Sequence, residues 1–187
     1  MGRLRSYAPT GDVGLRRRAG VIQLERCGPF MPPITLPGVG DIVVPNSTRR
    51  QIELAGLTGI TWQSVDKVRI VKSDWETWTT DEKLPPALPS GGEPENYILG
   101  QPHDPATAAS MGELWEIVLD KWGTGIAEII SRRPRETRVK LSDGDKPMPD
   151  LFNADGIRYT FVSVRAREWL QQHCPEWVSF QTVEWQH

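Results

Sequence analysis

The chain is poor in the residues that mark disulfide-stabilised, metal-binding or membrane-spanning proteins. Its 187 residues include two cysteines, Cys27 and Cys174, which are too few for a disulfide framework or for a zinc site of their own. No apolar run approaches the ~18–20 residues that cross a membrane. The first residues carry charge without the apolar core of a secretory signal. We therefore expect one soluble domain, residues 1–187, in the cytoplasm.

Histidine is also scarce, with three in the whole chain, and this limits the catalytic chemistry available. His173 and Cys174 are neighbours, so a helix would point their side chains in different directions and they would form no nucleophile–base pair. His103 and Asp104 are one fragment of a possible site, with no second fragment nearby. The glycines at 123–125 follow an expected helix, which is the wrong context for a phosphate-binding loop. We expect no catalytic, cofactor-binding or metal-binding residues.

Charge is unevenly distributed, although the net charge is only −2. Basic residues gather in residues 1–26 and 121–140, whereas residues 74–120 are acidic with Lys83 as their one base. A sequence pI near 6.0 argues against a nucleic-acid-binding protein. Blocks of one sign favour instead a surface that attracts an oppositely charged protein.

The strongest surface signal is an acidic and aromatic run in which Trp75 and Trp78 lie three residues apart between carboxylates. Two interpretations stay open. The run captures a basic partner, with charge steering the encounter and tryptophan supplying buried area, or it is a strand end whose tryptophans pack inward. The candidate partner-binding residues are acidic or aromatic: Asp74, Trp75, Glu76, Trp78, Asp81, Glu82, Glu93 and Glu95.

Two segments, residues 42–66 and 160–184, align with each other without a gap. The matched pairs are similar in character: Val44 with Val162, Arg49 with Arg167, Ile52 with Leu170, Ile60 with Val178, Trp62 with Phe180, and Gln63 with Gln181. Each segment has the pattern of a short strand, a helix of roughly ten residues, a tight break and a second strand. We therefore predict an α/β (α+β) fold with two pseudo-repeated strand–helix–strand units around one mixed sheet.

The remaining segments give less regular patterns. Alternating residues in 20–26 predict a first strand. In the helix of the first unit, Ile52 and Leu54 are expected on the apolar side. Residues 79–109 are rich in proline and predict a long loop that is either functional or without a task. A capping-box pattern at Ser110–Glu113 predicts a further amphipathic helix, with apolar side chains along one side: Leu114, Trp115, Val118, Leu119 and Trp122.

The last 40 residues resemble a known family. The Pro-Asp-Leu-Phe run at 149–152, the strand and helix at 159–173 and the closing strand at 178–184 are similar to the C-terminal signature of bacterial immunity proteins of polymorphic-toxin systems. These include the myxobacterial double-CXXCG family. Residues 54–62 resemble the helix-and-strand part of the same signature. This chain keeps only Cys27-Gly28 of the first cysteine motif and has no cysteine just before Asp150, so the zinc-like feature of that family is not carried over.

The resemblance implies a non-enzymatic protein that binds and blocks a cognate toxin in the cytoplasm of the producing cell and needs no cofactor. We expect the toxin to be basic, or to have a basic active-site cleft, and to contact the acidic residues of 74–120. The alternative is a hydrolase or other small enzyme with its site in residues 79–109, using His103 and Asp104. The sequence leaves the oligomeric state open.

Overall fold

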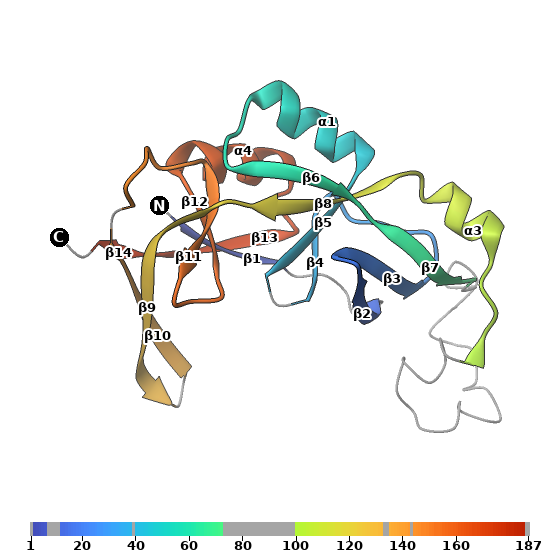
Figure 1. Cartoon of the computed structure of the whole chain (residues 1–187), viewed down its shortest axis with the longest axis horizontal. Helices are drawn as coiled ribbons and strands as arrows, with labels where there is room; N and C mark the ends of the chain where they lie inside the picture. Colours follow the sequence, from blue (N-terminus) through green and yellow to red (C-terminus); the bar gives the residue numbers. More distant parts are fainter. Residues whose placement is uncertain are drawn as a thin grey trace.

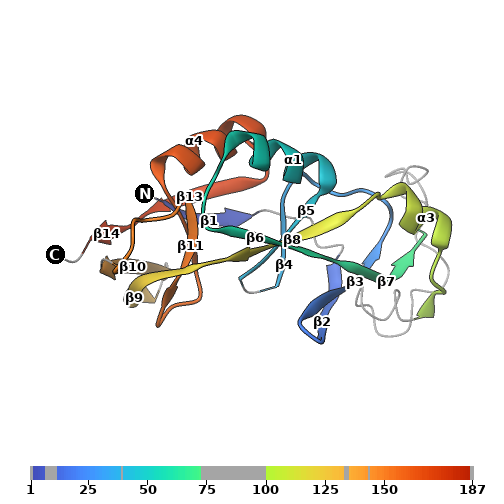
Figure 2. The same cartoon turned by 45° about the horizontal axis from the view of Figure 1, so that its top comes forward.

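The computed structural model describes residues 2–6, 12–38, 40–72, 100–132, 135–142 and 144–185. The fold is α+β, as predicted, and it has more strand than helix. The strands form three sheets, however, so the single mixed sheet that we predicted is wrong. The two longer helices, α1 (Asn46–Ala55) and α4 (Val164–His173), lie side by side along one side of the molecule (Figures 1 and 2).

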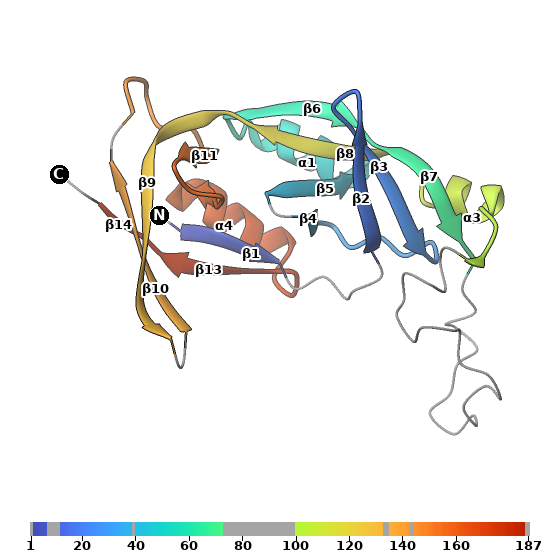
Figure 3. The same cartoon turned by 60° about the horizontal axis from the view of Figure 1, so that its bottom comes forward.

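The largest sheet has seven strands in the order β13-β1-β12-β11-β9-β10-β14. In that order they are β13 (Val178–Thr182), β1 (Gly2–Ser6), β12 (Thr160–Val162), β11 (Leu151–Asp155), β9 (Lys121–Arg132), β10 (Arg135–Ser142) and β14 (Glu184–Trp185). Only Val183 separates β13 from β14, although these strands lie at opposite ends of the order. The sheet therefore curls until one short stretch of chain contributes both of its end strands (Figure 3).

The second sheet has four strands in the order β4 (Thr35–Gly38), β5 (Asp41–Pro45), β8 (Leu114–Leu119) and β6 (Ile60–Ser64). The third has β2 (Asp12–Arg18), β3 (Val21–Cys27) and β7 (Asp66–Val71). β3 confirms the strand predicted over 20–26, and its side chains are alternately buried and half-buried, as the sequence pattern required. The short helix α3 (Pro105–Ser110) begins inside the segment 79–109, so the predicted loop is wrong for its last five residues, and residues 79–99 lie outside the described part of the chain.

Residues 42–66 and 160–184 each contain a helix between two strands, and a remote strand lies between those two strands. β8 pairs antiparallel with both β5 and β6, and β1 pairs antiparallel with both β12 and β13. Each arrangement is thus a split β-α-β unit. The first lies in the four-stranded sheet and the second in the seven-stranded sheet. The two sets of strands do not share a sheet because each unit takes its middle strand from elsewhere in the chain.

The amphipathic helix predicted over 110–122 is wrong. This stretch begins at Ser110, the last residue of α3, and continues as strand β8 and, after Asp120, as the start of β9. Apolar residues at 114, 115, 117, 118 and 119 fit either a helix or a buried strand by sequence alone. β8 pairs with β5 on one side and with β6 on the other, so its backbone hydrogen bonds are made on both sides. This pairing favours the strand over the helix.

The largest hydrophobic cluster lies beneath both helices and joins the two units. Its buried members come from both units, from the start of β11 and from the residue before β4: Ile34, Ile42, Val44, Ile52, Ile117, Leu151, Val162, Ala166, Leu170, Cys174 and Val178. Ile52 is buried as expected, but Leu54 is 89% exposed, so its assignment to the apolar side of α1 is wrong. Gly56 ends α1 in the left-handed conformation, with φ +62°, and turns the chain towards β6.

Asp150 fixes the second helix against the end of the first. Its carboxylate accepts hydrogen bonds from the Ser163 hydroxyl at 2.7 Å and from the Thr58 backbone N–H at 3.1 Å. Ser163 in turn caps α4 by accepting from the Ala166 N–H. Arg165 binds Asp150 at 2.9 Å and donates to the backbone carbonyls of Ala55 and Gly56 at the end of α1. These contacts set the position of α4 over the seven-stranded sheet.

Candidate functional site

The residues predicted to bind a partner lie outside the described part of the structure. This holds for the whole set: Asp74, Trp75, Glu76, Trp78, Asp81, Glu82, Glu93 and Glu95. Their role as a partner surface therefore stays a prediction.

His103 and Asp104, the residues of the enzymatic alternative, hold α3 against β7. The Ile70 backbone N–H donates to His103 Nδ1 at 3.0 Å, so the lone pair of that nitrogen is engaged. Asp104 caps α3 by accepting from the Thr107 N–H at 2.7 Å, and this bond holds the pKa of its carboxyl below the ordinary value. The Asp104 N–H donates to the Ile70 carbonyl at 2.8 Å. Both side chains have structural contacts here.

The other titratable pair, His173 and Cys174, is also separated by the fold. Cys174 is buried in the cluster beneath the helices, and burial raises the pKa of its thiol to about 11. The His173 ring stacks on Trp169 with its centroid 4.2 Å away, and its Nδ1 lies 2.8 Å from the Trp169 carbonyl oxygen. Among the described residues, no group of three or more His, Cys, Asp or Glu side chains is placed to hold a metal ion.

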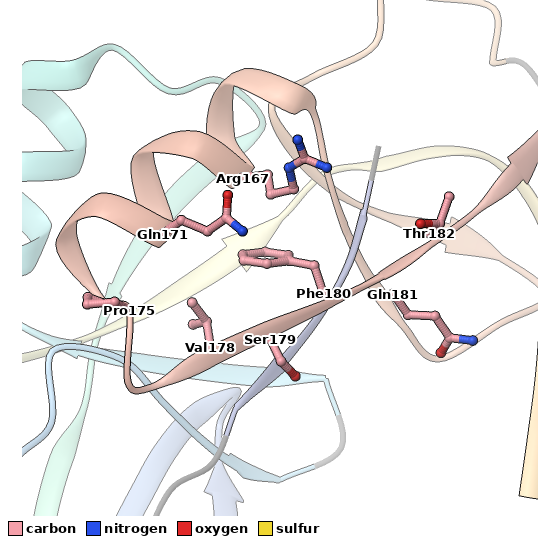
Figure 4. A pocket seen from close by; sticks show the side chains of 8 residues that line it. All are labelled: Arg167, Gln171, Pro175, Val178, Ser179, Phe180, Gln181 and Thr182. Carbon is pink, nitrogen blue, oxygen red and sulfur yellow. The ribbon is translucent and has the colours of Figure 1, made fainter.

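A groove of about 560 Å³ lies between α4 and β13 (Figure 4). Helical spacing places Arg167 and Gln171 on one wall, and Pro175 follows just after the helix. Across from them lies β13. Its residues 178 to 182 complete the lining: Val178, Ser179, Phe180, Gln181 and Thr182. The groove thus has an apolar floor and polar side chains along its helix wall.

The alternation of β13 explains how one strand lines the groove. Phe180 points towards α4, whereas Ser179 and Gln181 point away from it (Figure 4). Phe180 is half-buried and Val178 is buried, and both pack against the cluster beneath the helices. The apolar contacts hold β13 under the helix, while the strand remains open along its outer side.

That outer side is the edge of the seven-stranded sheet. β13 pairs with β1 on one side over the whole span Val178–Thr182. In the described residues no strand pairs with the other side at these positions. An edge strand presents backbone N–H and C=O groups that another extended segment can bind.

The Arg167 side chain, on the helix wall of the groove, has a buried donor without an acceptor in the described chain. Its Nε is buried and has no hydrogen-bond partner among the residues that the structure describes. A buried donor on a charged group costs free energy unless an acceptor reaches it. The groove therefore combines an open strand edge with an unsatisfied cationic donor.

A second cavity, of about 520 Å³, lies at the turn between β8 and β9. Trp122 and Lys121 line it, but their polar atoms have partners: Trp122 Nε1 donates to the Lys146 carbonyl, and Lys121 binds Asp155 at 2.6 Å. The Lys121 amine and the Trp122 indole N–H are therefore already engaged within the chain.

Sequence reasoning missed the groove, although the sequence held a signal for it. The alignment of the two segments matches Arg49 with Arg167, and at the position four residues on it matches Glu53 with Gln171. The second segment has the arginine but has glutamine in place of the carboxylate one helical turn along. This difference between the aligned segments points to the helix wall of the groove. The edge position of β13 had no such signal, because strand order depends on the pairing of β1.

In comparisons with protein-family models, curated proteins and solved structures, nothing matches this chain. Among the described residues, no helix has the length and apolar character needed to cross a membrane.

Proposed function

We propose that this protein works by binding another protein, and that it is an immunity protein that neutralises a cognate toxin in the cytoplasm of the producing cell. The observation that carries the proposal is the groove between α4 and the open edge of β13. Proteins often bind an extended segment of a partner by adding it to a sheet edge, with side-chain pockets supplying specificity. The groove has both features.

The resemblance to immunity proteins supports the same part of the molecule. The run at 149–152 contains Asp150, which fixes the start of α4 through Ser163. The other stretches of the signature are β12, α4 and β13 themselves. The residues that carry the resemblance thus include both walls of the groove and the aspartate that positions the start of α4.

The acidic residues of 74–95 are proposed as a second contact, for a basic surface or cleft of the toxin. Reversing the charges at Asp74, Glu76, Asp81 and Glu82 together should slow association with the toxin and make it less sensitive to salt. Unchanged association at low ionic strength would remove this contact from the proposal and would leave the function itself intact.

We further propose that the two split β-α-β units are two versions of one building unit. This is supported by their bounds, because α1 and α4, and likewise β6 and β13, occupy aligned positions from first residue to last. The register of the middle strand agrees as well. Glu116 lies opposite Val43 and Gln63, and Arg3 lies opposite the aligned Phe161 and Gln181.

The function is tested by protection. The gene directly upstream of this one in its genome would be expressed in a laboratory bacterium with and without this chain, and growth followed. We expect the upstream gene to be toxic alone and harmless together with this protein, and the two products to copurify. Growth arrest that persists despite full expression of this protein, with no complex formed, would overturn the proposal.

A further inference from the structure

Arg49 and Arg167 occupy aligned positions in the two units but differ in their partners. Arg49 Nε donates to Glu53 Oε1 at 2.9 Å, one helical turn along α1. Its guanidinium also lies over the Trp115 ring, with the Arg49 Cζ 3.7 Å from the ring centroid, and 5.7 Å from that of Trp62. In the first unit the arginine is therefore satisfied from within the chain.

The second unit keeps the arginine and replaces the carboxylate. Gln171 stands at the position aligned with Glu53, and it lines the groove beside Arg167. The Arg167 Nε is buried and has no partner in the described part of the chain, whereas the Arg49 Nε donates to a carboxylate oxygen. The first unit thus shows, within the same protein, which chemical group the second unit lacks.

We propose that the groove beside α4 binds an extended segment of the partner protein, which pairs with the outer edge of β13 and places a carboxylate on Arg167. This inference rests on the proposed function, since it assigns the contact that the partner makes. A carboxylate fits better than a neutral acceptor because hydrogen bonds between ionised groups are the stronger ones. The amide of Gln171 can donate to the same carboxylate, which the Glu53 side chain cannot do in the first unit.

The groove favours a polypeptide over other anions. A strand edge offers donors and acceptors in alternation, which a peptide backbone complements and a chain of phosphates does not. Val178, Phe180 and Pro175 supply apolar contact for the side chains on either side of the acidic residue. The segment would contribute one acidic side chain between apolar or β-branched residues, in the extended conformation that those residues favour.

The test begins with a library of random peptides of about six residues, the usual length of a strand, displayed on phage and selected against the full chain. We expect the selected peptides to share an Asp or Glu flanked by apolar or β-branched residues. On binding of a selected peptide, backbone amides within residues 178–182 should exchange with solvent more slowly. Failure to enrich any peptide, or enrichment of peptides without an acidic residue, would overturn the inference.

Matched variants then test the carboxylate contact. Gln171→Glu supplies Arg167 with the internal carboxylate that Arg49 has, so it should weaken a selected peptide about tenfold or more, as expected for loss of a charge-assisted hydrogen bond. Glu53→Gln makes the reverse change in the first unit and should leave peptide affinity unchanged. Equal affinity of the wild type and Gln171→Glu would sink the proposal.

Further measurements distinguish loss of the groove contact from a folding defect and from failure of the proposed function. Gln171→Glu should melt at or above the wild-type temperature, because it forms an ion pair like that of Arg49 and Glu53. If it melts lower, Arg167→Gln provides the second test, and it should weaken the acidic peptide far more than a peptide with Gln in place of the acidic residue. If the toxin binds the wild type and Gln171→Glu equally, the groove contact fails and the immunity function stands. If acidic peptides bind as described and no protection is seen, the groove contact stands and the immunity function fails.

Discussion

Arg17 in β2 and Glu116 in β8 form a two-point ion pair that joins the three-stranded sheet to the four-stranded sheet. Arg17 Nη2 lies 2.6 Å from Glu116 Oε1, and Nη1 lies 3.1 Å from Oε2. Arg17 Nη2 also binds Asp41 at 2.5 Å. The hydrogen bonds to Glu116 raise the pKa of Arg17 above its already high value, so Arg17 keeps its positive charge.

Removal of Arg17 should therefore destabilise the protein. The Glu116 side chain is only 5% exposed, so Arg17→Ala leaves a nearly buried carboxylate without its main partner. We expect a loss of about 2–3 kcal/mol in the free energy of unfolding, somewhat below the usual range for a buried pair because Arg17 is partly exposed. Urea titration measures it. Arg18→Ala, at the exposed neighbouring position, is the control and should change stability by less than about 0.5 kcal/mol.

Asp150 should make stability depend on pH in the acid range. Burial opposes its ionisation, but the hydrogen bonds from Ser163 and Thr58 and the charge of Arg165 outweigh burial, so the pKa of Asp150 lies below its ordinary value. Its contribution is therefore fully present above the unfolded-state pKa of about 3.9 and is lost as the pH falls through the lower folded-state pKa.

Asp150→Asn should then cost about 2 kcal/mol at neutral pH and progressively less in acid. Unfolding curves at a series of pH values check this, and a cost that stays constant from neutral pH down to pH ~2 would contradict it. Asp155→Asn serves as the control. Its ion pair with Lys121 is exposed on both sides, so the change should be small at neutral pH.

Gly59 should tolerate no side chain. Its φ is +85°, and a Cβ built there would lie 2.1 Å from the Leu151 carbonyl oxygen and 2.6 Å from Pro149 Cβ. Gly59→Ala must therefore move the backbone between α1 and β6, and we expect a loss of about 3 kcal/mol or more. Gly112 has a similar positive φ of +65° with open space around it, so Gly112→Ala should cost only about 1 kcal/mol. Equal losses at the two sites would show that the backbone angle, and not the close approach, sets the cost.

The two thiols should react with alkylating reagents at very different rates. Burial raises the pKa of Cys174 to about 11, and its side chain lies in the core, so it should react only after the protein opens. Cys27 is half-buried, and burial raises its pKa as well, so it should react slowly but first. Mass spectrometry at pH 8 with increasing urea checks the order. Alkylation of Cys174 before Cys27 in the native protein would contradict this assignment.

Local patterns predicted those elements whose residues interact mainly with their neighbours in sequence. The helices α1 and α4 and the strand β3 follow from helical periodicity and from strand alternation, which act over a few residues. Pattern reasoning failed at β8, where apolar residues suit two structures equally. It also failed at Leu54, which lies two residues from the buried Ile52 and therefore points to the opposite side of α1.

The sequence by itself predicted an α+β fold with two aligned strand–helix–strand segments. Only the tertiary structure decided that β1 and β8 enter those segments as middle strands, because pairing between remote strands depends on the whole chain and leaves no periodic signal in either partner. The same pairing leaves β13 at an edge of its sheet, beside the helix that carries Arg167. The groove therefore comes from contacts between distant segments. The difference between Glu53 and the aligned Gln171, in contrast, can be read from the sequence alone.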